Sequence, residues 1–409
     1  MKTMKPLIFL LALLNSIPYI GQVTGVIIHE KTMEPIAYAN ISVENSSLGC
    51  ISNSLGAFQM RIPEKCMNDH LKVSAVGIET VEINLKTFKN NDTIWVKEKV
   101  VELAELKVYN NLPPAIEMVR ISLNKLPELG YRKPYELNMF YRHYCSEKNV
   151  YGRLIEAAIV LTDNKGHKKK VEKPADKIGV KVQELRRSFD FTENFDEHEP
   201  ISIYSTLKYD VMSYPSILSF YPHDYNFRLV DTTFIDNKML WVVEYHYDKV
   251  NRIKMDTVRE NCSGKIFINA EDNGILLIEE HQEGRIEKEY ETQAMIIDWR
   301  VQYQIFEGHY FLKYLSETSQ SYEELRSTQQ SIVQTKDHKA NVEMMVNDIR
   351  LYDVEKNILK EPDREQLDDM KYNPEFWKDY NILKNTPLNE KIVIDLEKRA
   401  EIETQFKGN

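Results

Sequence analysis

Histidines and acidic residues are the side chains of this sequence that could build a hydrolytic centre. A zinc carboxypeptidase needs a histidine followed three residues later by glutamate, so that both side chains reach one metal ion. None of the ten histidines has glutamate at that position, and no His-Glu-x-x-His motif occurs. The G-x-S-x-G elbow, the Walker A loop and the G-x-G-x-x-G fingerprint are missing too. We therefore predict no catalytic, cofactor-binding or metal-binding residue and no cofactor.

The histidines and carboxylates that remain favour structural roles. His143, His223 and His246 lie among aromatic residues, where a lone histidine usually belongs to the packing. The oxygen-rich stretch 269–273 lacks the twelve-residue calcium-loop pattern and fits a hairpin turn better. A glycosidase needs two carboxylates facing each other across a cleft, and the 63 acidic residues leave that arrangement open.

Tyrosines are frequent between residues 214 and 225. Tyr214, Tyr221 and Tyr225 are the candidates for an aromatic surface that stacks on a ligand such as a sugar. Aromatic residues in a β-rich domain more often serve as core or strand-pair residues. The surface is therefore a hypothesis, with packing as its alternative.

The N-terminus has the pattern of a secretory signal peptide. Lys2 and Lys5 precede an apolar run at 7–14, which is much shorter than the roughly 20 residues that cross a bilayer. We expect a signal peptide over residues 1–22 and export to the periplasm or the outer-membrane periphery. Retention as an N-terminal anchor is the alternative. No later segment is apolar enough to cross a membrane as a helix, although association with the outer membrane stays open.

The charge of the chain limits its partners. The net charge is −10, and it becomes about −12 when Lys2 and Lys5 leave with the signal peptide. Nonspecific nucleic-acid binding requires a basic face, so we exclude nucleic acid as a partner. The lysine-rich stretch 165–181 predicts a solvated loop, with a basic contact for an anionic partner as the alternative.

The four cysteines are Cys50, Cys66, Cys145 and Cys262. They form no C-x-x-C pair, and their spacing fits no zinc ribbon or finger. An exported protein can form disulfides. Cys50 and Cys66 lie in one small domain and are the candidate disulfide pair, with two separate buried thiols as the alternative. Cys145 and Cys262 could also pair.

Short β-rich runs separated by turns fill the first hundred residues, as in a sandwich. Leu55-Gly56 is expected to close a hairpin, where glycine supplies a positive φ. Four motifs follow in order: VTGVI at 23–27, TMEPIAYANISV at 32–43, LGCISNSLGAF at 48–58 and LKVSAVGIE at 71–79. This order resembles the carboxypeptidase-D regulatory-like domain of Bacteroidetes envelope proteins. The resemblance implies a transthyretin-like β-sandwich over residues 23–109, with a closing strand at 103–108. It implies no peptidase activity, because the catalytic domain of the parent enzymes is absent.

The pattern changes after residue 110. Apolar residues at 116, 119, 123 and 126 predict a linker helix over 114–126 with proline in its first turn. Aromatic and apolar runs then predict long antiparallel strands, including a hairpin at 264–275. We expect the linker helix and a larger β-rich, α+β domain over 110–345. This pattern is similar to the half-barrel of lipoprotein-localisation proteins, which would imply an apolar cavity for an acyl chain.

The last residues, 346–409, predict a charged helical tail. Thr386 is a good N-cap with Pro387 at the first helical position, and Ile392 and Leu396 give that helix one apolar face. Phe376 and Trp377 are expected to dock the tail on the second domain, with a ligand site as the alternative.

Taken together, these patterns predict a mainly β, non-enzymatic protein of the cell envelope that binds or scaffolds. The expected partner is an envelope protein or a small ligand, whether glycan, lipid or peptide. One alternative is an accessory of an outer-membrane, TonB-dependent uptake system, because this regulatory-like domain precedes the plug of many such receptors. The chain has no recognisable plug and is too short for a barrel of about 22 strands. The other alternative is a cryptic hydrolase acting on glycan or peptide.

Overall fold

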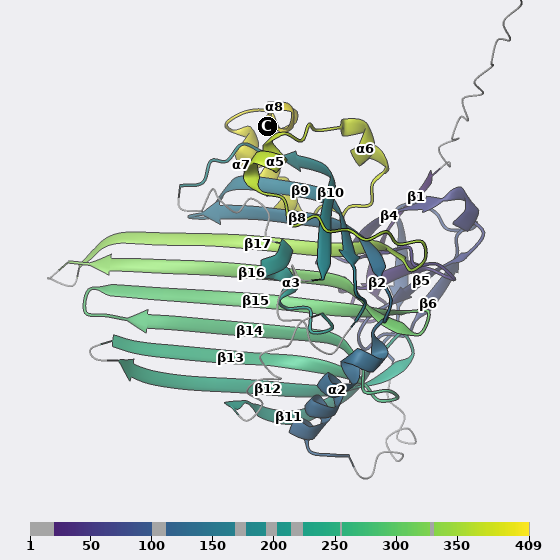
Figure 1. Cartoon of the computed structure of the whole chain (residues 1–409), viewed down its shortest axis with the longest axis horizontal. Coiled ribbons are helices and arrows are strands. Elements are labelled where there is room, and N and C mark those ends of the chain that lie inside the picture. The colour runs from purple at the N-terminus through teal and green to yellow at the C-terminus, as the bar shows by residue number, and fades with distance from the viewer. Residues whose placement is uncertain are drawn as a thin grey trace, which may run out of the picture.

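The computed structural model describes residues 20–99, 112–167, 177–193, 203–213, 224–253, 256–327 and 331–408. These residues form a small sandwich, one large antiparallel sheet and a group of short C-terminal helices (Figure 1). The fold is mainly β, as predicted. The closing strand expected at 103–108 and nearly all of the predicted signal peptide lie outside the described residues.

The sandwich consists of two sheets that enclose one apolar core. The sheets have the strand orders β4-β1-β7 and β3-β2-β5-β6. Alternate residues of β4, namely Phe58, Met60 and Ile62, are fully buried, because successive side chains of a strand point to opposite faces. The strands are β1 (Ile20–His29), β2 (Asn40–Val43), β3 (Gly49–Ile51), β4 (Ala57–Pro63), β5 (His70–Ser74), β6 (Val81–Asn84) and β7 (Asp92–Val96).

The connection between β3 and β4 differs from the predicted hairpin. Gly56 does have a positive φ of 70°. However, β3 pairs with β2, whereas β4 pairs with β1 in the other sheet. Asn53 stabilises the turn by accepting hydrogen bonds from the backbone N–H groups of Leu55 and Ala57. The turn therefore transfers the chain between sheets instead of closing a hairpin.

Ten strands form the large sheet, in the order β10-β9-β8-β17-β16-β15-β14-β13-β12-β11. β11 to β17 are successive neighbours, and β17 then pairs with β8. The predicted hairpin around Asn273 joins β13 to β14, with Asn273 at a φ of 62°. The strands are β8 (Tyr135–Glu147), β9 (Val150–Asp163), β10 (Ile178–Arg187), β11 (Asn226–Ile235), β12 (Lys238–Ile253), β13 (Asp256–Asn269), β14 (Ile275–Glu287), β15 (Glu291–Phe306), β16 (His309–Arg326) and β17 (Ile332–Arg350).

The two faces of the large sheet contact different parts of the chain. The helix face, which carries Tyr141 and Trp299, packs against α2 (Ala115–Leu129) and α3 (Ile203–Leu207), which lie in front of the sheet in Figure 1. The opposite face, here called the groove face, carries Phe140 and Tyr314, which join the sandwich core. The predicted linker helix is thus present, and it continues three residues past Leu126.

Four short helices follow the sheet and gather beside β8, β9 and β10 (Figure 1). β17 continues to Arg350, past the predicted start of the tail at residue 346. Thr386 caps the third helix and Pro387 begins it, as predicted. Trp377 is buried at the junction of the sandwich and the large sheet, which docks the tail there. The helices are α5 (Arg364–Asp368), α6 (Pro374–Asp379), α7 (Pro387–Glu397) and α8 (Ile402–Gly408). In the described part of the chain, no helix has the length and apolarity needed to cross a membrane.

All four cysteines are buried free thiols, so the predicted Cys50–Cys66 disulfide is absent. Cys50 lies in β3, whereas Cys66 ends a short 3₁₀ helix that follows β4 of the other sheet. The alternative of two separate buried thiols describes this pair. Cys145 and Cys262 lie in β8 and β13, which four intervening strands hold roughly 24 Å apart.

Gly264 in β13 allows a close approach on the helix face. A Cβ atom at this position would overlap the ring of Tyr245, which is fully buried. We therefore expect Gly264→Ala to lower the free energy of unfolding by about 1–3 kcal/mol, because the ring must move in a packed core. Gly284 in the neighbouring strand β14 has open space around its Cα, so Gly284→Ala is the matched control and should be close to neutral. Urea unfolding of both variants measures the difference.

Candidate ligand-binding groove

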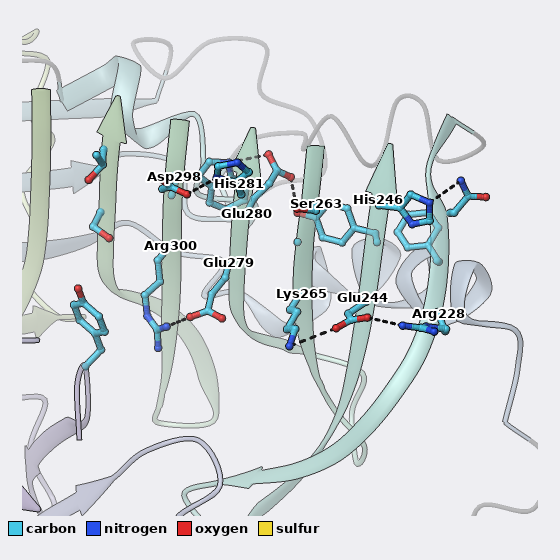
Figure 2. Close-up of a pocket in the computed structure, with 18 residues that line it drawn as sticks. Arg228, Glu244, His246, Ser263, Lys265, Glu279, Glu280, His281, Asp298 and Arg300 are labelled. Atoms are coloured by element: carbon cyan, nitrogen blue, oxygen red, sulfur yellow. Dashed lines mark hydrogen bonds and ion pairs between the residues drawn. The ribbon is translucent and has the colours of Figure 1, made fainter. Parts of the chain in front are cut away.

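An open groove of about 1110 Å³ lies on the groove face over β11 to β16. Tyr38 of the sandwich closes one end, where its ring lies 5.0 Å from the guanidinium carbon of Arg300. Tyr38 has a positive φ of 56°, and its backbone N–H donates to the Ser52 carbonyl. Figure 2 shows the polar side chains that line the groove. They are Asn226, Arg228, Glu244, His246, Ser263, Lys265, Glu279, His281, Asp298, Arg300, Ser316 and Thr318.

A single row of directly opposed residues crosses the whole large sheet on this face. Each strand contributes one residue, and nine of the ten are charged, with the sign alternating from strand to strand except at one serine. Opposite charges in directly opposed positions stabilise strand pairing. We call this set the charged row; from β11 to β10 it comprises Arg228, Glu244, Lys265, Glu279, Arg300, Ser316, Glu343, Arg142, Glu156 and Arg186.

The half of the charged row that lines the groove is open to solvent. Glu244 accepts a hydrogen bond from Arg228 at 3.0 Å, and it also pairs with Lys265 at 3.4 Å. The hydrogen bond from Arg228 is the main cause that lowers the pKa of the Glu244 carboxyl. Glu279 pairs with Arg300. Figure 2 shows these five side chains side by side across the strands. Four of the five side chains are at least 34% exposed and Arg300 is 18% exposed, so the carboxylates stay solvated and each pair contributes little to folding stability.

The other half of the charged row is covered by the sandwich and the tail. Glu156 pairs with Arg142 at 2.7 Å and also with Arg186. Burial raises the pKa of Glu156, but the two guanidinium groups outweigh it, so that the pKa lies below its ordinary value. Burial raises the pKa of the Glu343 carboxyl, which lies 3.8 Å from Arg142. The charged row therefore forms a buried ion-pair network at one end and part of an open surface at the other.

A second row of opposed residues lies beside the charged row in the groove. His246, Ser263, His281 and Asp298 occupy neighbouring strands in register. His281 Nδ1 lies 2.7 Å from Asp298 Oδ1, and both side chains are about half exposed. A histidine held by a carboxylate next to a serine is the arrangement of a serine hydrolase. However, β13 is paired on both sides, so the backbone N–H groups around Ser263 already serve the sheet and are not free to form an oxyanion hole there.

A buried carboxylate, Glu280, lies behind the groove on the helix face. It accepts hydrogen bonds from the Tyr245 hydroxyl and from Trp299 Nε1. Burial and the adjacent carboxylate raise the pKa of Tyr245 well above its ordinary value. Both donors are almost fully buried, so this cluster fixes the sheet under the groove and is closed to solvent.

The aromatic surface predicted from the sequence lies only partly in the described residues. Tyr214 and Tyr221 are outside them. Tyr225 is partly buried and packs beside Tyr245 and Tyr247, with ring centroids 5.7 and 5.6 Å away. Tyr225 therefore takes part in packing on the helix face, whereas the ring that faces the groove is that of Tyr38.

The chemistry of the groove is that of a polar binding surface. Within the described ranges, no group of three or more His, Cys, Asp or Glu side chains could hold a metal ion. The charged and hydroxyl side chains also make the groove a poor site for an acyl chain, which requires an apolar lining. The apolar cavity expected from a lipoprotein carrier is therefore not what this groove provides.

Sequence reasoning missed the charged row and the His281–Asp298 pair. Their members lie on different strands and are distant in the sequence, and only strand register brings them together. One signal was present, because the hairpin at residues 269–275 places Lys265 opposite Glu279. His246 was singled out and does lie in the groove, whereas His143 is buried in β8 and His223 is outside the described residues.

Comparisons with known proteins identify the sandwich. Residues 23–108 match the family model described as CarboxypepD_reg-like domain, so this part of the chain is such a domain. No curated protein matches the chain. One solved structure, that of a Bacteroides fragilis protein of unknown function described as a candidate membrane-associated protein, is similar over 81% of this chain and 98% of its own. The identity is 10% and the TM-score is 0.14.

Proposed function

We propose that this chain, whose residues 23–108 are a CarboxypepD_reg-like domain, is an exported, non-enzymatic binding protein of the cell envelope. The observation that supports it is the open groove that Tyr38 and the large sheet form together. The side chains of the charged row that line it pair with one another. Export is supported by the N-terminal sequence pattern, with Lys2 and Lys5 before an apolar run.

In this proposal the two parts of the chain have different tasks. The sandwich packs on the groove face through Phe140 and Tyr314 and supplies Tyr38 as the end wall of the groove. The large sheet supplies the polar floor. A volume of about 1110 Å³ is at or above the ~300–1,000 Å³ of typical small-molecule pockets, so an elongated ligand suits the groove.

The cryptic hydrolase is the second candidate, because His281, Asp298 and Ser263 lie together in the groove. The engagement of the backbone N–H groups around Ser263 in the sheet argues for binding over turnover. We expect no hydrolysis of p-nitrophenyl esters or of labelled casein above the rate of the His281→Asn variant. Turnover that disappears in this variant would favour the hydrolase instead.

Binding in the groove is tested by thermal unfolding with three classes of ligand: oligosaccharides, fatty acids and unstructured peptides. A ligand present at about 100 times its Kd stabilises the folded state by about 2.7 kcal/mol, which raises Tm by several degrees. We expect one class to raise the Tm of the wild type and to lose this effect in Lys265→Glu. Arg285→Glu is the control, because Arg285 lies on the same sheet face outside the groove lining. A ligand effect that survives Lys265→Glu would place binding elsewhere.

A further inference from the structure

The covered half of the charged row already holds an extended peptide, which is a segment of this same chain. Residues 380–386, here called the tail segment, have no helix or strand structure and lie over β17 and β8. Their carbonyl groups accept hydrogen bonds from side chains. Asn347 donates to the Asn381 carbonyl at 2.9 Å, and Arg142 donates to the Leu383 carbonyl at 3.2 Å.

The sandwich also binds the tail segment. Asn53 Nδ2 donates to the carbonyls of Lys384 and Asn385, at 3.1 and 3.3 Å. The contacts named so far all involve the backbone of the tail segment, which every peptide sequence shares. One side chain, Leu383, is buried. Side chains of the tail segment contribute as well: Asn385 Oδ1 accepts a hydrogen bond from Arg142 at 2.8 Å, and Asn381 Oδ1 accepts one from the Arg61 backbone N–H at 2.6 Å. The part of this recognition that a different peptide can share is the part made to the backbone carbonyls.

Arg142 shows how a member of the charged row binds a peptide while keeping its salt bridge. Its Nε donates to Glu156, and its Nη2 is directed at the tail segment. Arg300, which stands in the same row on the open half, also holds a salt bridge. Its Nη1 pairs with Glu279, and its Nε is buried with no hydrogen-bond partner among the described residues. The guanidinium group of Arg300 lies at the end of the groove, next to the ring of Tyr38.

The length of the groove also fits an extended chain. β11 to β16 are six neighbouring strands, which span about 24 Å at their ordinary spacing. A seven-residue extended peptide, such as the tail segment, spans about 23 Å. Arg228, Lys265 and Arg300 are distributed along this length as donors, and the serine and threonine hydroxyl groups lie between them.

We infer that the groove binds an extended polypeptide segment of a partner protein through its backbone carbonyl groups. The inference rests on the proposed binding function and names its ligand class. The partner segment continues, on the open half of the charged row, the interface that the tail segment makes on the covered half. A glycan is less suited, because Tyr38 is the one Phe, Tyr or Trp ring on this face among the described lining residues, whereas Phe227, Tyr245 and Trp299 pack on the helix face.

The test uses the full chain and a fluorescein-labelled ten-residue peptide that copies residues 378–387. In the full chain the tail segment already occupies the covered half of the charged row. A peptide added in trans therefore has to use the open half. We expect saturable binding by fluorescence anisotropy and a loss of affinity of about fivefold or more in Arg300→Gln, because a hydrogen bond from a charged donor is removed. Lys265→Gln is the second groove variant. It tests the same groove at another position in case Arg300→Gln disturbs the local fold. Arg285→Gln is the control and should bind like the wild type.

Two further probes separate the possible results. A peptide with the same residues in shuffled order should bind within about threefold of the first, because the backbone is recognised. Affinity should change little between low and moderate salt, because a neutral carbonyl is weakly screened. The inference is overturned if neither peptide binds, or if both bind Arg300→Gln and Lys265→Gln as well as the wild type. If a labelled cellohexaose binds instead and is lost in these variants, the peptide inference fails while the proposed binding function stands.

Discussion

Replacement of Glu156 by glutamine is expected to lower the free energy of unfolding by about 3–5 kcal/mol, because it leaves the buried Arg142 and the half-buried Arg186 without their shared carboxylate. Glu156 is almost fully buried and pairs with Arg142 and Arg186. Arg142 also holds the Leu383 carbonyl, so the tail should loosen as well. Urea unfolding measures the first effect, and limited proteolysis of the C-terminal helices measures the second.

Glu279→Gln is the matched control for this change. Glu279 stands in the same charged row and pairs with one arginine, but 41% of its side chain is exposed. A pair whose carboxylate is solvated to this extent contributes about 0–1 kcal/mol, so this variant should unfold nearly as the wild type does. If both variants lose the same free energy of unfolding, the contribution of each carboxylate depends on its position in the row and not on its burial.

The pH dependence of the Glu156 effect has a definite sign. The folded-state pKa of Glu156 lies below the ordinary value of 4.5. Its contribution to stability is therefore fully present above pH 4.5 and is lost as the pH falls through the lowered folded-state pKa. The difference between wild type and Glu156→Gln should accordingly be constant near neutral pH and shrink in acid.

The elements of this fold that could be predicted from the sequence are those with a local cause. The linker helix follows from apolar residues at helical spacing, and the Thr386 cap follows from the preference of helix N-termini for that residue type. The sandwich follows from short strands and from the order of its motifs, and the CarboxypepD_reg-like match at residues 23–108 confirms it. Positive φ at Gly56 and Asn273 was predictable for the same local reason.

The elements that could not be predicted depend on long-range pairing. Gly56 marks a turn, but the sequence cannot say whether β4 returns to β3 or enters the other sheet. The charged row needs the register of nine strand pairs, and a shift of one residue in any pair would move its member to the other face. For that reason Arg142 and Arg300 are ordinary polar strand residues in the sequence and become equivalent positions only in the folded sheet.

The Lys313 side chain, at the contact between the sandwich and the large sheet, gives the clearest expected pH effect. Its ammonium group is completely buried beside β3 and donates one hydrogen bond, to the Val346 carbonyl at 3.2 Å. Burial lowers the pKa of Lys313 from 10.5 to about 8, with only partial compensation from Cys50 and Asp348. The folded state therefore disfavours the charged form. At neutral pH this opposes folding by about 3 kcal/mol, because each pKa unit corresponds to about 1.4 kcal/mol.

The sign of the effect follows from linkage. The unfolded chain binds this proton more tightly than the folded chain, so stability rises with pH from about 8 towards 10.5. We expect Lys313→Met to be more stable than the wild type at pH 7 and to lose this advantage steadily up to about pH 10. Urea unfolding at pH 7, 8.5 and 9.5 measures it. Buried tyrosines such as Tyr314, whose pKa is raised, titrate in both proteins and cancel in the difference. A constant difference across this range would mean that the Lys313 ammonium is as well solvated in the folded protein as in the unfolded chain, and that the contact between the sandwich and the sheet admits water.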